Sequence, residues 1–243
     1  MEKSAEIYGI RAVIEAINSK KDIDKVFIQT GLKGKLIGQL ESLIRKNKIN
    51  FSYVPKQKLD RLSKKNHQGV IARISPIKFF DINEFSEIIE KSKIPFILIL
   101  DQISDVRNFG AIIRTAEISG VDGIIIQNSS SAPVNSDTVK TSAGAIFNIP
   151  ICKVSHIKDA IYHLQSMDIS IICASEKAEK NIYDVNFKRP VAIVMGSEQK
   201  GINKSVLSLS NEMVKLPMFG KIESLNVSVA CGIFLYEVVR QRI

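Results

Sequence analysis

The sequence predicts an α/β protein in which a small α/β domain, residues 1–74, precedes a larger domain, residues 94–243, with a parallel sheet covered by helices. Two observations lead to this prediction. From residue 94 onward, continuous apolar segments of strand length alternate with helical segments, as expected for parallel strands buried on both faces. Before that point, residues 75–93 are polar, with Pro76, Asn83 and alternating charges, which predicts a linker.

The first domain is predicted from short apolar segments separated by polar, basic loops. The expected elements are a helix over 10–17, a strand over 26–29, a helix over 36–46, and strands over 51–54 and 70–74. Its lysines and arginines gather in loops and on exposed helix faces. Such runs are most often solvated surface, but their density in one small domain favours contact with RNA. The linker is expected to contain one short amphipathic helix.

The larger domain is predicted from the alternation of strands and helices along the chain. The expected strands cover 96–100, 123–126, 149–153, 169–173, 191–195 and 213–216, and the expected helices cover 111–119, 136–141, 157–167 and 204–209. A final helix follows, with apolar residues at i, i+3, i+4 and i+7: Val227, Ala230, Cys231, Phe234, Leu235, Val238 and Val239. This pattern predicts a buried helix with a rigidly fixed start.

Composition narrows the class of protein. A hydrophobic content of 45% and a charged content of 24% are typical of a globular protein rather than a disordered one. The net charge of +9 favours a polyanionic partner, because lysine and arginine displace counterions from phosphates, although a genome-wide lysine bias would produce the same charge. The longest apolar run, 94–100, is too short to span a membrane, and M-E-K-S-A-E lacks the apolar core of a signal peptide.

The cysteines and histidines do not form the patterns of a disulfide framework or a metal site. Cys152, Cys173 and Cys231 lie in apolar segments without a C-x-x-C pair, which indicates reduced core thiols in a cytoplasmic protein. The histidines, which are His67, His156 and His163, have no metal-ligand spacing to a cysteine or an acidic cluster. No metal is therefore expected.

Two segments in the last third of the chain predict a pocket built by loops. V-A-I-V-M-G-S-E-Q-K-G-I at 191–202 runs from a strand into Gly196, where the missing side chain would let a ligand approach the main chain. K-L-P-M-F-G-K-I-E-S-L-N-V-S-V-A-C-G at 215–232 leads from a strand to Ser224 and Asn226, either of which can cap the final helix. We expect the two loops to leave neighbouring strands and to enclose one small molecule. No G-x-G-x-x-G follows a predicted strand, which argues against a dinucleotide-binding domain.

A third segment, L-D-Q-I-S-D-V-R-N-F-G-A-I-I-R-T-A-E at 100–117, contains Asn108 and Arg114, with Gly110 expected to open the helix between them. One interpretation of Arg114 is a surface ion pair with Glu117, three residues further along the helix. The other is partial burial near the sheet, because most neighbouring helix positions are apolar. Glu198, in the second segment, could anchor a cationic group or be solvated.

These three segments resemble motifs 1, 2 and 3 of the SpoU/TrmH family of RNA ribose 2′-O-methyltransferases, within the SPOUT superfamily, in the same order and at similar separations. The resemblance is strong over 94–243, and I-Y-G-I-R-A-V-I-E-A-I at 7–17 with N-H-Q-G-V-I-A at 66–72 extends it to the front. Over the whole chain the pattern is similar to the bacterial type that methylates a guanosine of 23S ribosomal RNA. The resemblance implies a deep trefoil knot, an L30e-like RNA-binding domain at 1–74, and a homodimer formed through the knotted domain, with the final helix as an interface element.

The resemblance also implies roles for individual residues. S-adenosylmethionine would be held by Gly196, Leu216 and Leu225, with Gly201 and Met218 nearby. The residues implied in catalysis are Asn108, Arg114, Glu198, Ser224 and Asn226. Among these, Arg114 would be the key residue, binding a phosphate and stabilising the developing alkoxide. One departure from the family pattern is Gln199, which stands where many relatives have glycine.

Three functions remain open at this point. The first is methylation of 23S ribosomal RNA, with transfer RNA as the alternative substrate. The second is a ribosome-assembly RNA-binding protein that has the same fold but no reaction; the presence of all five implied catalytic residues argues against it. The third is an unrelated nucleotide-binding α/β enzyme, disfavoured by the missing phosphate-loop and dinucleotide patterns.

Overall fold

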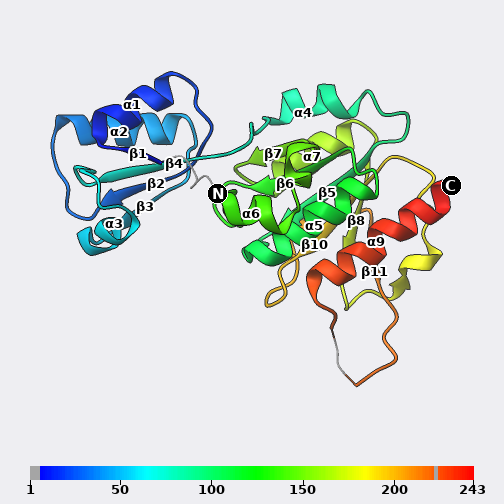
Figure 1. Ribbon diagram of the computed structural model, residues 1–243. Coiled ribbons are helices and arrows are strands. Elements are labelled where there is room, and N and C mark those ends of the chain that lie inside the picture. The colour runs from blue at the N-terminus through cyan, green and yellow to red at the C-terminus, as the bar shows by residue number, and fades with distance from the viewer. Residues whose placement is uncertain (1–5, 222–223) are drawn as a thin grey trace. The chain divides into compact units, whose positions relative to one another are not determined.

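A computed structural model describes residues 6–221 and 224–243 of the chain (Figure 1). The chain divides into two compact units. The first extends to Lys78 and includes Pro133–Ser136, and the second comprises Phe79–Ala132 and Asp137–Ile243. Most of the sequence expected as a linker therefore belongs to the second unit.

The first unit is a four-stranded sheet with helices on it. Its elements are β1 (Glu6–Tyr8), α1 (Ile10–Asn18), β2 (Ile23–Gln29), α2 (Lys35–Lys46), β3 (Phe51–Val54), α3 (Lys56–Leu62) and β4 (Val70–Ile74). The strand order is β1-β4-β2-β3, with β4 antiparallel to both of its neighbours and β2 parallel to β3. Val26 and Ile28 of β2 are buried with α1 and α2, whereas Phe27 is buried with Leu59 of α3, as the alternation of side chains along a strand requires. Strand β1 and helix α3 were not expected from the sequence.

The second unit contains the predicted parallel sheet, which is confirmed. Its strands are β5 (Phe96–Asp101), β6 (Gly123–Gln127), β7 (Ile151–Val154), β8 (Ser170–Ala174), β9 (Lys180–Asn181), β10 (Val191–Gly196) and β11 (Glu212–Lys215). All pairings are parallel, in the order β7-β6-β5-β10-β8-β11-β9. Strands β10 and β11 are separated by β8, so the expectation that the loops of segments 191–202 and 215–232 leave neighbouring strands is wrong.

Helices cover this sheet. They are α4 (Ile82–Ile89), α5 (Val106–Ile118), α6 (Ser136–Thr141), α7 (Ile157–Ser166), α8 (Lys204–Leu207) and α9 (Val227–Arg242), with short 3₁₀ turns η1 (Ala145–Phe147) and η2 (Ile182–Asp184). Helix α4 lies in the expected linker, yet its Phe85 and Ile89 are fully buried in the core of the second unit. The position of Phe85 requires glycine at 123, because a Cβ there would lie 2.3 Å from the Phe85 ring.

Helix α5 begins at Val106 rather than at the glycine. Asp105 is its N-cap, and the Asp105 Oδ1 accepts a hydrogen bond from the backbone N–H of Asn108 at 2.8 Å. Gly110 lies inside the helix, where a Cβ would come within 1.9 Å of the Thr141 Oγ1. The expectation that Gly110 opens the helix is wrong: this glycine permits close packing of α5 against Thr141.

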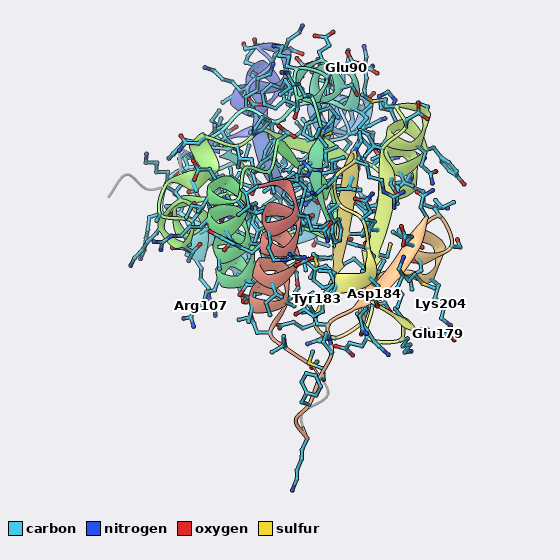
Figure 2. All side chains as sticks on the ribbon, turned by 90° about the vertical axis from the view of Figure 1, so that its right-hand side faces the viewer. Glu90, Arg107, Glu179, Tyr183, Asp184 and Lys204 are labelled. Atoms are coloured by element: carbon cyan, nitrogen blue, oxygen red, sulfur yellow. The ribbon has the colours of Figure 1, made fainter. Side chains whose placement is uncertain are left out.

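The final helix α9 lies beside α5 on one side of the sheet (Figure 2). Its residues Cys231, Phe234 and Leu235 are buried, but Val229 and Tyr236 are exposed. The prediction of a buried helix is therefore correct for one face only, because Val229, Ile233 and Tyr236 place apolar side chains on the exposed face as well.

The last turn of α9 is hydrogen-bonded to the segments that precede the central strands β5 and β10. The Arg242 guanidinium donates hydrogen bonds to the carbonyl oxygens of Ile94 at 2.8 Å, Phe187 at 3.0 Å and Arg189 at 2.8 Å. It also lies over the ring of Phe96, 5.2 Å from the centroid. One side chain therefore joins α9 to the segments that lead into β5 and β10.

All three cysteines are free and buried. Burial raises the pKa of each thiol to about 12, so each remains protonated near neutral pH. None has the exposed thiolate that a nucleophilic cysteine needs. In the part of the chain that the structure describes, none of the helices is long and apolar enough to cross a membrane.

Candidate active site

The candidate site lies at the carboxyl edge of the parallel sheet, where β5 and β10 end side by side. Asp101, the last residue of β5, is in register with Gly196, the last residue of β10. Asp101 is almost fully buried, and its Oδ2 accepts a hydrogen bond from the backbone N–H of Asn203 at 2.7 Å. This bond ties the far end of the loop that leaves β10 back to β5.

The loop after β10 closes on itself directly above Gly196. The N–H of Ser197 donates to the carbonyl oxygen of Gly201 at 3.2 Å, and the N–H of Gly201 donates to the Ser197 carbonyl at 2.8 Å. A Cβ on Gly196 would lie 2.2 Å from the carbonyl carbon of Gly201, which itself has a φ of 65°. The expectation that Gly196 leaves room for a ligand at that point is therefore wrong, because the chain's own backbone fills the space. Gln199 has no positive φ, so this turn accommodates its side chain without backbone strain.

Three polar side chains from the three sequence segments meet above this edge. The Glu198 Oε1 accepts hydrogen bonds from the Asn108 Nδ2 at 3.1 Å, the Asn226 Nδ2 at 2.6 Å and the backbone N–H of Val227 at 3.3 Å. The Asn226 Nδ2 also donates to the Asn108 Oδ1 at 3.0 Å. Segments separated by about half of the chain are thus joined through one carboxylate oxygen.

The orientation of the Asn226 amide follows from its position at the start of α9. Its Oδ1 accepts from the backbone N–H of Ser228 at 3.0 Å and of Val229 at 3.4 Å, so Asn226 is the N-cap. The amide nitrogen must then point to the other side, toward Glu198 and Asn108. Capping the helix and binding the carboxylate are therefore two consequences of one amide geometry.

A pocket of about 280 Å³ opens beside this hydrogen-bonded set. It is lined by Gln102, Ile103, Ser104, Asp105, Asn108, Ser130, Ser197, Glu198, Gln199, Lys200 and Val227. Several of these residues were not singled out from the sequence: Gln102, Ile103, Ser104, Asp105, Ser130 and Lys200. Gln102 has a φ of 62°, a strained value for a residue with a side chain, and a single sequence carries no direct signal of it.

Arg114 lies apart from this set. It lies six positions after Asn108 on α5, which places it about 120° around the helix axis from that side chain. Arg114 is exposed, and among the described residues it has no hydrogen-bond or ion-pair partner, while the Glu117 carboxylate accepts from the Asn148 Nδ2 at 3.3 Å. Both sequence interpretations, the ion pair with Glu117 and the partial burial, are therefore wrong. The guanidinium is available to a ligand.

The other residues implied by the resemblance lie on the loop that leaves β11. Leu216 is half-buried, and Met218, Ser224 and Leu225 are exposed. None of these four lines the pocket. After β11 this loop extends away from the sheet (Figure 1), and Leu225 directly precedes Asn226 in the chain. Within residues 6–221 and 224–243, the acidic, histidine and cysteine side chains form no group of three that could hold a metal ion.

The sequence profile of the SpoU rRNA methylase family matches residues 95–236, more than half of the chain. The chain belongs to the SpoU rRNA methylase family. A second profile, described as RNA 2′-O ribose methyltransferase substrate binding, matches residues 7–80. The resemblance found in the three motif segments is thus confirmed. The trefoil knot and the L30e-like character of the first domain stay predictions.

Relatives of this SpoU methylase cover nearly its whole length. YacO of Bacillus subtilis, a putative TrmH family tRNA/rRNA methyltransferase, is 34% identical over 238 residues, which is 97% of this chain and 95% of that protein. The 23S rRNA (guanosine-2′-O-)-methyltransferase RlmB of Vibrio vulnificus is 34% identical over 243 residues, 98% of this chain and 97% of that one. The SpoU methyltransferase AviRb of Streptomyces viridochromogenes, crystallised with AdoMet, has a TM-score of 0.63 at 21% identity, covering 98% of this chain and 89% of that chain. This last likeness shows the fold alone.

The amide geometry of Asn226 predicts how two substitutions will differ. Serine and aspartate both cap helices about as well as asparagine, but only aspartate places a second carboxylate against the Glu198 Oε1. We expect Asn226→Asp to lower the free energy of unfolding by about 1 kcal/mol more than Asn226→Ser, since two unit charges about 4 Å apart in water repel by about that amount. Urea unfolding at pH 7 and low salt measures the difference.

Added salt serves as the control for this prediction. Screening weakens repulsion between exposed charges, so the difference between the two variants should shrink as ionic strength rises. Equal stabilities at low salt would contradict the assignment of the Asn226 Nδ2 as the donor to Glu198.

Proposed function

We propose that this SpoU methylase uses S-adenosylmethionine to methylate the ribose 2′-hydroxyl of a guanosine in 23S ribosomal RNA. The observation that carries the proposal is the hydrogen-bonded set of Asn108, Glu198 and Asn226, which joins all three motif segments beside one pocket. The 34% identity to Vibrio vulnificus RlmB supports a 23S guanosine as the target. A ribose of transfer RNA is the alternative target, because the Bacillus subtilis relative is named for both RNAs.

For the cofactor, we propose the residues implied by the family motifs, which are Gly196, Gly201, Leu216, Met218 and Leu225. The apolar side chains of Met218 and Leu225 are exposed on the loop after β11, which suits contact with the flat face of an adenine ring. Gly196 and Gly201 would contribute by shaping the turn that carries Glu198. When bound, S-adenosylmethionine would supply a methyl group activated by its positively charged sulfur. The 2′-oxygen would gain this methyl, the sulfur would keep the electrons of the broken carbon–sulfur bond, and the hydroxyl proton would pass to water.

The Asn108–Glu198–Asn226 set would hold the acceptor ribose. Both hydrogens of the Asn226 Nδ2 are used, one toward Glu198 and one toward Asn108. The Asn108 Nδ2 donates one hydrogen to Glu198 and keeps a second for a ligand. Asn108 would therefore orient the RNA, and Glu198 and Asn226 would hold Asn108 in place. Ser224 would add an exposed hydroxyl near the start of α9.

Arg114 would stabilise negative charge on the RNA rather than act as a general base. A guanidinium stays protonated in proteins, so it cannot readily remove the proton from a ribose hydroxyl. It can bind the adjacent phosphate and stabilise negative charge as it develops on the 2′-oxygen. The exposure of Arg114, without an ion-pair partner in the described parts of the chain, supports this role.

We further propose that the protein is a homodimer that covers the outer face of α9. Val229, Ile233 and Tyr236 expose apolar surface there, next to Tyr183, which lies beside the helix (Figure 2). A two-fold dimer would bury this face against its own copy.

The proposed activity is tested by cofactor binding and methyl transfer. Calorimetry should give about one S-adenosylmethionine site per subunit, and a labelled methyl group should reach 23S ribosomal RNA taken from cells that lack this gene. Leu225→Asn should weaken cofactor binding at least about tenfold, because a buried apolar contact becomes polar. Leu36→Asn is the matched control, since Leu36 is 37% exposed and Leu225 is 38% exposed.

Each outcome of this experiment separates the candidate functions. Methyl transfer to transfer RNA alone would replace the 23S substrate but keep the chemistry. Cofactor binding without transfer to any cellular RNA would favour the non-catalytic ribosome-assembly protein. No cofactor binding by the wild type would contradict the assignment as a methyltransferase.

Arg114 is tested by single-turnover kinetics on a ribosomal RNA fragment. We expect Arg114→Ala to slow methyl transfer by roughly 10²–10³, as for the loss of one preorganised donor, with cofactor affinity unchanged. Arg114→Lys should recover only part of the rate because lysine lacks the planar fork. Arg107→Ala is the control, an exposed arginine in the first turn of the same helix (Figure 2). A rate within about twofold of wild type for Arg114→Ala, or about 0.4 kcal/mol of barrier, would remove Arg114 from catalysis.

Sedimentation equilibrium tests the dimer. The wild type should have twice the 27.0 kDa mass of the chain. Tyr236→Asp should shift it to monomer at micromolar concentration, because a charge would be buried in the interface. Tyr162→Asp, on α7, replaces a similarly exposed tyrosine and should leave the dimer intact. A monomeric wild type, or a Tyr236→Asp variant that dimerises normally, would contradict this proposal.

A further inference from the structure

In the first unit, four chain segments converge on one edge of the sheet. Strands β1, β2 and β3 run in the same direction and β4 runs opposite, so the turn after β1, the loop after β2, the start of α3 and the loop before β4 lie together. Backbone bonds join them: the N–H of Gly9 donates to the carbonyl of Val70 at 3.0 Å, and the N–H of Gln29 donates to that of Gly69 at 2.8 Å.

His67 holds the loop before β4 in a fixed shape. It is buried, and its Nδ1 accepts from the N–H of Gly69 at 3.0 Å, so the ring proton must lie on Nε2. The Nε2 then donates to the Asp60 carboxylate at 2.9 Å. This ordering presents Lys64, Lys65 and Gln68 on a preformed surface.

The charge of this edge is strongly positive. The segment from the loop after β2 to the start of α2 carries Lys33 and Lys35, the first turn of α3 carries Lys56 and Lys58, and the loop before β4 carries Lys64 and Lys65. All six are exposed. Across residues 9–11, 30–35 and 55–69, Asp60 is the one acidic residue, and it already accepts from His67. Tyr8, at the end of β1 beside these stretches, is half-buried, and the Lys65 Nζ lies over its ring, 5.1 Å from the centroid.

The opposite edge of the same sheet is also basic but differs physically. Its four lysines lie at or just after the ends of α1 and α2, where helix carbonyls carry partial negative charge: Lys20, Lys21, Lys46 and Lys48. Asp22 lies in the same loop as Lys20 and Lys21. At the first edge, α1 and α2 begin instead, with neither an acidic residue in the first turn nor a capping side chain. Helix dipoles therefore add to the lysine charge at one edge and offset it at the other.

We propose that this edge, formed by residues 9–11, 30–35 and 55–69 and here named the loop edge, is the surface on which the first unit binds the phosphate backbone of a folded RNA. The proposal rests on the RNA substrate of the proposed function. Lysine ammonium groups on a preformed surface bind phosphates, so this contact positions the RNA and does not read its sequence. Selection of the target nucleotide is then left to the second unit.

Two sets of substitutions with equal charge change test the loop edge in the full-length protein. The first is Lys33→Gln, Lys35→Gln, Lys56→Gln and Lys64→Gln together. The second is Lys20→Gln, Lys21→Gln, Lys46→Gln and Lys48→Gln together, at the opposite edge. Filter binding to a ribosomal RNA fragment should show at least about tenfold weaker binding for the first set at about 100 mM salt. The slope of log affinity against log salt should fall by about 0.7 to 0.9 for each phosphate that the protein no longer binds.

The second set should bind within about twofold of the wild type. Equal weakening by both sets would overturn the proposal, because binding would then follow net charge and not the loop edge. Unchanged binding by the first set would overturn it as well. Methyl transfer by the wild type is measured separately, so a failure of the proposed reaction would be visible apart from a failure of this surface.

Discussion

The hydrogen bonds to one carboxylate oxygen of Glu198 are the interaction on which the candidate site depends. Because Asn226 is both the N-cap of α9 and a donor to this oxygen, the start of the last helix and the loop after β10 cannot be placed independently. Asn108 enters the same network from α5. At the other end of α9, Arg242 binds the segments leading into β5 and β10. Helix α9 is thus held to the central strands at both ends. This attachment fixes the positions of Asn108, Glu198 and Asn226 relative to one another.

Close backbone contacts also restrict the loop after β10. A side chain at Gly196 would collide with Gly201, and the Asp101 carboxylate accepts a hydrogen bond from the backbone N–H of Asn203. The loop therefore has little freedom to move Glu198. A preorganised carboxylate of this kind orients its amide donors before a substrate arrives, which is how an active site avoids reorganisation during the reaction.

Sequence patterns predicted the parallel sheet because its buried strands read as continuous apolar runs. They missed β1, which has three residues, and they misplaced the start of α5, because Gly110 looked like a helix opening while the Asp105 cap went unnoticed. Strand order depends on contacts between distant segments and leaves no local sequence pattern. The position of β8 between β10 and β11 therefore could not be predicted from the sequence. Asn108, Glu198 and Asn226 were named through the family motifs, but their bonds to one another depend on that order. Arg114 was misjudged because exposed positions alternate with buried ones along α5.

The burial of the three thiols makes them reporters of local motion. Cys231 lies on the buried face of α9, whereas Cys152 and Cys173 lie in strands in the core of the sheet. Thiol reagents attack the thiolate, which these sites expose only when the surrounding structure opens. Labelling of Cys231 thus reports transient detachment of α9, and labelling of the other two reports opening of the sheet. The relative rates would rank the opening free energies of the two regions without any engineered probe.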